Sequence, residues 1–132
     1  MADHEATHLL PPRAASVVLA RRAVEALPLG AGRTGDVKLI VSELVTNSIE
    51  HGQLGALDRI ELRALVDQRG ALHMEVRDPG PGPRPGAEHG MGWRILDRMA
   101  DRWGIDRSDG LARVWFELDA GPQGVTRSTG RP

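Results

Sequence analysis

The residues LIVSELVTNSIEHG (39–52) carry most of the information about this chain. At about 100° per residue, four of their apolar side chains share one arc of a helix that runs from residue 37 to about residue 50, namely Ile40, Val41, Leu44 and Val45. Four polar residues gather along one edge of this arc: Glu43, Asn47, Glu50 and His51. Glu43 and Asn47 are four residues apart, so their side chains are neighbours on the helix surface. The pattern fits either a solvated helix boundary or a functional wall beside the core.

Two of these side chains have the chemistry of a cation site. The oxygen atoms of Glu43 and Asn47 are the kind of ligand that Mg²⁺ prefers, and Mg²⁺ usually takes only one or two protein ligands and keeps several waters. A carboxylate at such an edge can also accept a proton from water or from a hydroxyl group. The helix therefore favours a hard cation next to a general base.

The segment VRDPGPG (76–82) places Asp78 at the end of a predicted strand and two glycines after it, Gly80 and Gly82. A carboxylate at a strand end can accept a hydrogen bond from an exocyclic amine such as N6 of adenine. Glycine lets the backbone approach a flat ligand closely and permits positive φ. A plain turn is the alternative interpretation of this segment.

A third segment, HGMGWRILD (89–97), puts Gly90 and Gly92 just before a predicted helix. Free backbone N–H groups and the helix dipole at such a start favour anions, phosphates above all. A flexible N-terminal cap would give the same letters. Each of the three segments alone is weak evidence for a binding site. In this order and at these intervals, the three together indicate a nucleotide-binding site.

The rest of the chain predicts a two-layer α+β sandwich, with helices on one face of an antiparallel or mixed sheet. Apolar residues at helical or alternating spacing define the expected elements. The expected helices are 14–27, 37–50, capped by Asp36, and 93–103, and the strands are 59–67, 71–78, about 103–106 and 112–119. We expect a tail over residues 1–9, with a short strand near 7–10, one domain over 10–119, and a disordered tail over 120–132.

Composition narrows the possible classes of protein. With 132 residues and a formal net charge of −1, the chain suits one domain and lacks the field that attracts nucleic acid or an anionic membrane. The absence of cysteine excludes disulfides, zinc–thiolate sites and thiol catalysis. The sequence holds neither an apolar run of membrane length nor a signal-peptide layout, so we expect a cytoplasmic protein.

The segments ELVTNSIEHG, DPGPG and GMGWRILDRMADRWG resemble the N, G1 and G2 boxes of the Bergerat-fold (histidine-kinase-like) ATPases. Within that superfamily, the chain looks most like the small anti-sigma-factor serine/threonine kinases, over residues 10–119. The resemblance implies ATP and Mg²⁺ as ligands, with Glu43 as catalytic base and Asn47 as metal ligand. It further implies nucleotide-binding roles for a second set of residues: His51, Asp78, Gly80, Gly82, Gly90, Met91 and Gly92.

The same resemblance implies a kinase that phosphorylates an anti-sigma antagonist of the STAS type, a sigma factor as a further partner, and a homodimer. Many relatives carry a Gly-Thr pair before the last strand, where this chain has Leu111 and Ala112. The missing threonine supports a second hypothesis, a non-catalytic ATP-binding module that regulates a partner. A third is the catalytic half of a split histidine kinase, although no phosphoacceptor helix is visible.

Two other signals carry less weight. The letters HEATH (4–8) match the H-E-x-x-H zinc motif, but that motif needs both histidines on a packed helix, and prolines follow it closely. Trp115 shares a strand face with Arg113 and Glu117. It either marks a surface for a partner or is a singly exposed aromatic residue, which is normal.

Overall fold

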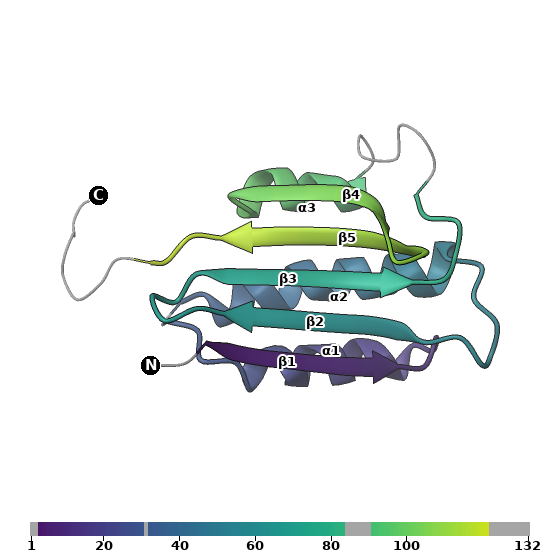
Figure 1. Cartoon of the computed structure of the whole chain (residues 1–132), viewed down its shortest axis with the longest axis horizontal. Coiled ribbons are helices and arrows are strands. Elements are labelled where there is room, and N and C mark those ends of the chain that lie inside the picture. Colours follow the sequence, from purple (N-terminus) through teal and green to yellow (C-terminus); the bar gives the residue numbers. More distant parts are fainter. Residues whose placement is uncertain (1–2, 31, 84–90, 122–132) are drawn as a thin grey trace.

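Five strands and three helices form two layers in a computed structural model, which describes residues 3–30, 32–83 and 91–121 (Figure 1). The strands are β1 (His4–Leu10), β2 (Ile60–Val66), β3 (Leu72–Asp78), β4 (Arg102–Ser108) and β5 (Leu111–Leu118). The helices α1 (Ala15–Glu25), α2 (Thr34–His51) and α3 (Met91–Met99) all lie on one face of the sheet. The predicted α+β sandwich is confirmed. Neighbouring strands, in the order β1-β2-β3-β5-β4, pair antiparallel in every case, so the sheet is not mixed.

The core lies between the sheet and the helices, with α2 at its centre. Alternate residues of β2 and β3 point into it because side chains alternate between the two faces of a sheet. Those buried on the sheet side include Ile60, Leu62, Val66, Leu72, Met74 and Val76, and those of α2 are Val37, Ile40, Val41, Leu44 and Val45. In Figure 1, α2 runs behind β3 with α1 to one side and α3 to the other. This packing fixes which flank of α2 faces each neighbouring helix.

The N-terminal segment differs from the expectation. His4–Leu10 is a full edge strand paired with β2, from His4 opposite Val66 to Leu10 opposite Ile60, whereas the sequence predicted a tail over 1–9 with a strand only near 7–10. Of this strand, only Leu10 is fully buried, so no apolar alternation reveals it. His4 and His8 lie roughly 13 Å apart along an extended strand, which rules out the zinc motif.

Three ends of helices and strands differ from the predicted ones, each for a local reason. α2 begins at Thr34, so Asp36 lies in its first turn rather than at the cap, where its charge favours the helix dipole. α3 ends at Met99 and β4 begins at Arg102, because Trp103 packs towards the core from a strand and stacks on Trp93 with ring centroids 6.2 Å apart. Among the described residues, no helix is both long and apolar enough to cross a membrane.

Candidate functional site

Asp78, the last residue of β3, is held from two directions at the end of its strand. Its side chain is buried, and its Oδ2 atom accepts a hydrogen bond of 2.8 Å from the Ser48 hydroxyl on α2. The backbone N–H of Gly80 donates to the Oδ1 atom, also at 2.8 Å. Each carboxylate oxygen has two lone pairs, so both keep capacity for one more donor. The carboxylate is therefore fixed in place and still able to accept from a ligand amine.

Gly80 brings the loop after β3 into backbone contact with the end of α2. A Cβ atom on Gly80 would lie 2.1 Å from the carbonyl oxygen of Gly52 and 3.0 Å from Oδ1 of Asp78. Gly52 is the C-cap of α2, and its N–H donates to the Ser48 carbonyl at 2.9 Å. Only glycine fits at position 80, because any side chain would overlap backbone atoms. Two segments almost 30 residues apart thus meet at Asp78.

Asn47 and Glu43 lie on the flank of α2 that faces away from α1. Two contacts mark the α1 side of α2, namely the ion pair Lys38–Glu25 and the hydrogen bond from Arg21 to Ser42. With Ser48 at zero and about 100° per residue, Lys38 and Ser42 fall near +80° and +120°. Asn47 and Glu43 fall near −100° and −140°, towards α3, which packs against α2.

The side chains of Asn47 and Glu43 are available to a ligand. Both are half-buried, and within the described part of the chain neither forms a hydrogen bond or an ion pair with another residue. An amide oxygen and a carboxylate one turn apart fit Mg²⁺, which would take its remaining ligands from water and phosphates. No group of three His, Asp or Glu side chains gathers as a metal site among the described residues, so a site formed by the protein alone is not indicated.

The remaining predicted residues are placed less closely. His51 ends α2 with an exposed side chain, 3.9 Å from the Glu50 carboxylate, and forms no hydrogen bond or ion pair with the described residues of the Asp78 loop. Met91 and Gly92 are the first two residues of α3, so the helix begins inside the Gly-Met-Gly motif rather than after it. Gly90 falls outside the described residues. Gly82 has a φ of 84°, in the left-handed region that favours glycine.

Three residues that contact Asp78 or the loop after it were not identified as site residues from the sequence: Ser48, Gly52 and Arg107. The signal for Ser48 was its position on the apolar arc of α2, where a buried hydroxyl needs a partner. Ala112, one of the two residues where the resemblance predicts a threonine, pairs with Asp78 in the sheet register. The Ser48 hydroxyl donates to the Asp78 carboxylate from the helix.

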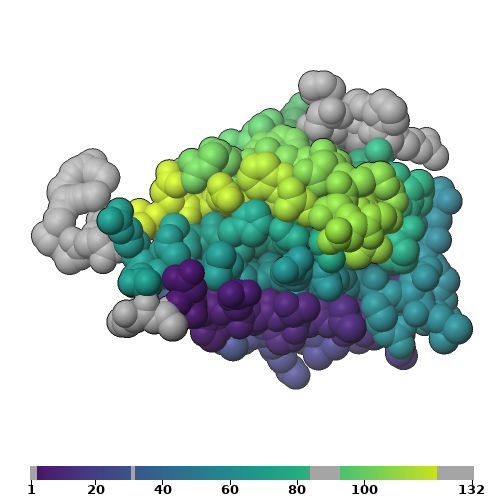
Figure 2. Space-filling model, viewed as in Figure 1, coloured from purple at the N-terminus to yellow at the C-terminus, as the bar shows by residue number. Residues whose placement is uncertain are grey.

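Figure 2 shows the face of the sheet that the helices leave uncovered. Charged side chains on this face form ion pairs with one another. Glu75 is buried there, and it accepts from Arg113 at 2.9 Å and contacts His73 at 2.8 Å. Trp115 stacks on His73, with centroids 5.9 Å apart, and lies over Gly104, where a Cβ atom would be 2.7 Å from its indole nitrogen. Trp115 is therefore packed within this charged face, on the side the sequence predicted.

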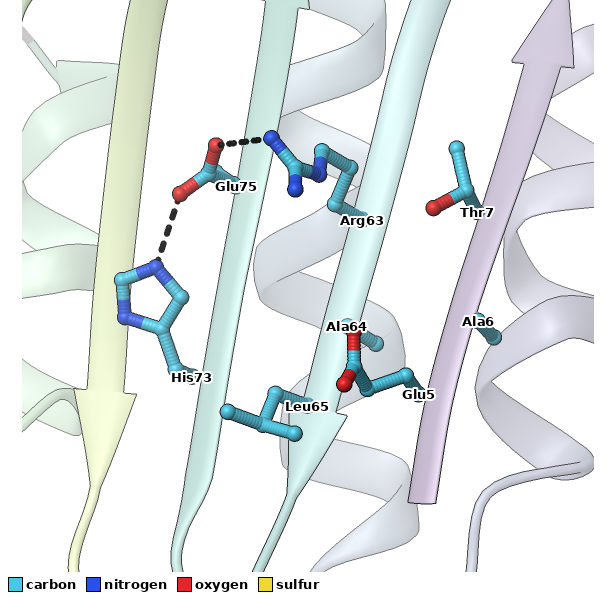
Figure 3. A pocket seen from close by; sticks show the side chains of 8 residues that line it. All are labelled: Glu5, Ala6, Thr7, Arg63, Ala64, Leu65, His73 and Glu75. Atoms are coloured by element: carbon cyan, nitrogen blue, oxygen red, sulfur yellow. Dashed lines mark hydrogen bonds and ion pairs between the residues drawn. The ribbon is translucent and has the colours of Figure 1, made fainter. Parts of the chain in front are cut away.

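A shallow hollow of about 140 Å³ opens on the same face, between β1, β2 and β3 (Figure 3). Its lining includes Glu5, Thr7 and Arg63, and the sticks show Glu75 between His73 and Arg63. None of the residues predicted to bind nucleotide lines it. The hollow and the Asp78 site lie on opposite faces of the sheet, because Asp78 points towards the helices with Met74 and Val76.

Comparisons with known proteins identify a family for this chain. The profile of the family described as "Histidine kinase-like ATPase domain" matches residues 10–118. An anti-sigma F factor of Geobacillus thermodenitrificans is 32% identical over 80 residues, which cover 50% of this chain and 55% of that protein. The chain thus spans about half the length of this curated relative.

Solved structures with low sequence identity share the fold. The RsbU and RsbW domains of Rv1364c from Mycobacterium tuberculosis superpose with a TM-score of 0.69 at 16% identity, covering 88% of this chain and 32% of that one. The histidine kinase domain of a blue-light activated kinase from Erythrobacter litoralis EL346 gives 0.62 at 20% identity, covering 87% and 68%. At these identities the likeness concerns the fold alone.

Proposed function

Because the chain belongs to the histidine kinase-like ATPase domain family, we propose that it binds Mg·ATP between α2, α3 and the loop after β3, and transfers the γ-phosphoryl group to a protein hydroxyl. The observation that carries the proposal is the meeting of Asp78 with α2, whose free flank holds Asn47 and Glu43. A base-recognising carboxylate and a magnesium ligand then belong to one site.

Each residue has a separate task in this proposal. Asp78 accepts a hydrogen bond from the exocyclic amine of adenine through the capacity that Ser48 and Gly80 leave free. Asn47 holds Mg²⁺, whose charge offsets the charge on the transferred phosphoryl group. Glu43, one turn earlier, accepts the proton of the attacking hydroxyl. The start of α3, with Met91 and Gly92, directs backbone N–H groups and the helix dipole at the phosphates.

The proposed substrate is an anti-sigma antagonist, and the proposed second partner is a sigma factor. The support for both is the 32% identity to an anti-sigma F factor. Phosphorylation adds roughly −1.5 to −2 charge units at neutral pH. At the interface with this protein the added charge would weaken binding of the antagonist, and the released protein would then bind the sigma factor. We propose a homodimer as the working assembly.

A second candidate function is a non-catalytic ATP-binding module, favoured by Leu111 and Ala112 where the expected threonine would stand. Such a protein would bind ATP through Asp78 but transfer nothing. The Ser48 hydroxyl reduces the weight of this argument, because Asp78 keeps a hydroxyl partner without the threonine.

One assay separates the two functions. The protein is incubated with labelled Mg·ATP and candidate antagonists, beside Asn47→Ala and Glu43→Gln, and both nucleotide binding and label transfer are measured. Glu50→Gln is the matched control, since Glu50 lies on the same helix with an exposed side chain. The kinase predicts transfer by the wild type and the control, and transfer lost in both site variants. Tight binding without any transfer would establish the module, and no binding would refute both.

A further inference from the structure

The loop after β3 cannot hold itself in place through its own backbone. Residues 79, 81 and 83 are prolines, which have no N–H to donate. The Gly80 N–H is used by Asp78. Within the described residues, no backbone N–H donates to a carbonyl of residues 79–83. Gly80 is the buried residue of this loop, so its carbonyl oxygen needs a donor from elsewhere in the fold.

Arg107 of β4 supplies that donor. Its Nη1 atom lies 3.3 Å from the carbonyl oxygen of Gly80 and 3.4 Å from that of Pro81. Its Nη2 atom donates to the carbonyl oxygen of Gly110 at 2.9 Å. Gly110 belongs to the tight turn between β4 and β5, in which both central residues have positive φ. One planar guanidinium group thus joins the loop to the rigid end of a hairpin.

The same hairpin meets the next glycine of the loop. A Cβ atom on Gly82 would lie 3.3 Å from Cβ of Ala112 and 3.9 Å from Nη1 of Arg107. Arg107 and Ala112 are directly paired between β4 and β5, so they form one platform under Gly80–Gly82. The loop is then fixed at three sides, by Ser48 and Gly52 of α2, by Asp78 itself, and by Arg107.

We propose that Arg107 is a positioning residue for nucleotide binding, which acts by holding the Gly80–Gly82 backbone in the form that leaves Asp78 accessible. This inference rests on the proposed function. Arg107 itself does not touch the adenine in this proposal. Without its guanidinium group, the loop would sample other conformations before ligand binds. The affinity for ATP would then fall in proportion to the fraction of the protein that has the binding-competent loop.

The test compares Arg107→Ala, Arg107→Lys and Arg102→Ala. Arg102 is the matched control, because it lies on the same strand and bonds two carboxylates, Glu117 and Asp119, far from the loop. Hydrogen exchange of the Gly80 amide is followed in the ligand-free protein, and the Kd for ATP is measured by calorimetry. We expect Arg107→Ala to lose about tenfold in Gly80 protection and in ATP affinity, with Arg107→Lys between it and the wild type.

The two readouts keep this inference separate from the proposed function. Gly80 exchange in Arg107→Ala equal to that in the wild type would overturn the positioning role. An equal loss in Arg102→Ala would also overturn it, since the effect would then come from general weakening of β4. If the wild type binds no ATP, the proposed function fails, whereas the exchange data still decide whether Arg107 holds the loop.

Discussion

At the scale of single residues, the most informative contact is the hydrogen bond between Ser48 and Asp78. It joins the last turn of the longest described helix, α2, to the end of a central strand, at a point where both side chains are buried. A buried carboxylate that loses a donor bears the cost of an unsatisfied charged group. The Ser48 hydroxyl therefore contributes both to the stability of the fold and to the orientation of Asp78.

Replacing Ser48 by alanine tests this double contribution. We expect Ser48→Ala to lower the free energy of unfolding by about 1–3 kcal/mol and to raise the Kd for ATP roughly tenfold, because Asp78 then has only the Gly80 N–H to hold it. Urea unfolding and calorimetry measure the two effects. Thr46→Ala is the control, because Thr46 lies on the same helix and its side chain forms no hydrogen bond with another described residue. Wild-type affinity in Ser48→Ala would show that Asp78 does not need the hydroxyl.

The sequence predicted Asp78, Gly80 and Gly82 as one group because they are adjacent in the chain and chemically distinctive. It did not identify Ser48, Gly52 or Arg107, because each acts through a contact across 27 to 30 residues. Periodicity places a residue on a face of its own element, but it does not say which atom of another element lies opposite. The roles of Asn47 and Glu43 remain predictions.

At the scale of elements, the contact between the end of α2 and the loop after β3 depends on Gly80. A methyl group there would overlap the Gly52 carbonyl oxygen at 2.1 Å, and backbone atoms must shift to relieve it. We expect Gly80→Ala to lower the free energy of unfolding by about 1–3 kcal/mol, as other overpacked sites do. Equilibrium urea unfolding measures the change. Gly55→Ala is the control, because its Cβ atom would meet nothing closer than 3.7 Å; equal midpoints for the two variants would contradict the argument.

Elements with strong apolar patterns were predicted well, and those without were not. β2 and β3 alternate cleanly and were found within a residue or two. β1 exposes most of its side chains and is recognisable only through its ladder with β2, a tertiary fact. The predicted strand 103–106 was shorter than β4. At its start, Trp103 was also assigned to the preceding helix. At its end, the Asp109-Gly110 turn, a standard hairpin signal, would have extended the prediction to Ser108.

At the scale of the whole molecule, the two faces of the sheet are stabilised in different ways. One buries apolar residues under three helices and carries the Asp78 site at its end. The other holds charged residues in pairs. Burial raises the pKa of Glu75, but hydrogen bonds from His73 and Arg113, together with their charges, outweigh it, so the pKa lies below its ordinary value. The hydrogen bond from Arg113 likewise lowers the pKa of Asp106.

These lowered pKa values make the stability of the uncovered face depend on pH. A carboxyl group whose pKa is lower in the folded than in the unfolded protein stabilises the fold above its unfolded pKa, and that stabilisation is lost as the pH falls through the folded pKa. We expect Arg113→Met to cost about 1–3 kcal/mol near pH 7, since it leaves Glu75 buried without its cation. The difference from the wild type should shrink as the pH falls below the ordinary glutamate pKa of 4.5, because the wild type then loses the stabilisation that comes from the lowered pKa of Glu75.

Urea unfolding at pH 7, 5 and 3 measures this difference directly. Arg98→Met is the matched control, because Arg98 is an exposed arginine on α3 and its replacement should cost little at any pH. A cost for Arg113→Met that stays constant from pH 7 to pH 3 would mean that Arg113 acts through packing on Trp115, over which its guanidinium lies at 5.9 Å. A cost that vanishes in acid would instead show that the charge pairs hold this face together, so that the sheet needs no apolar cover on that side.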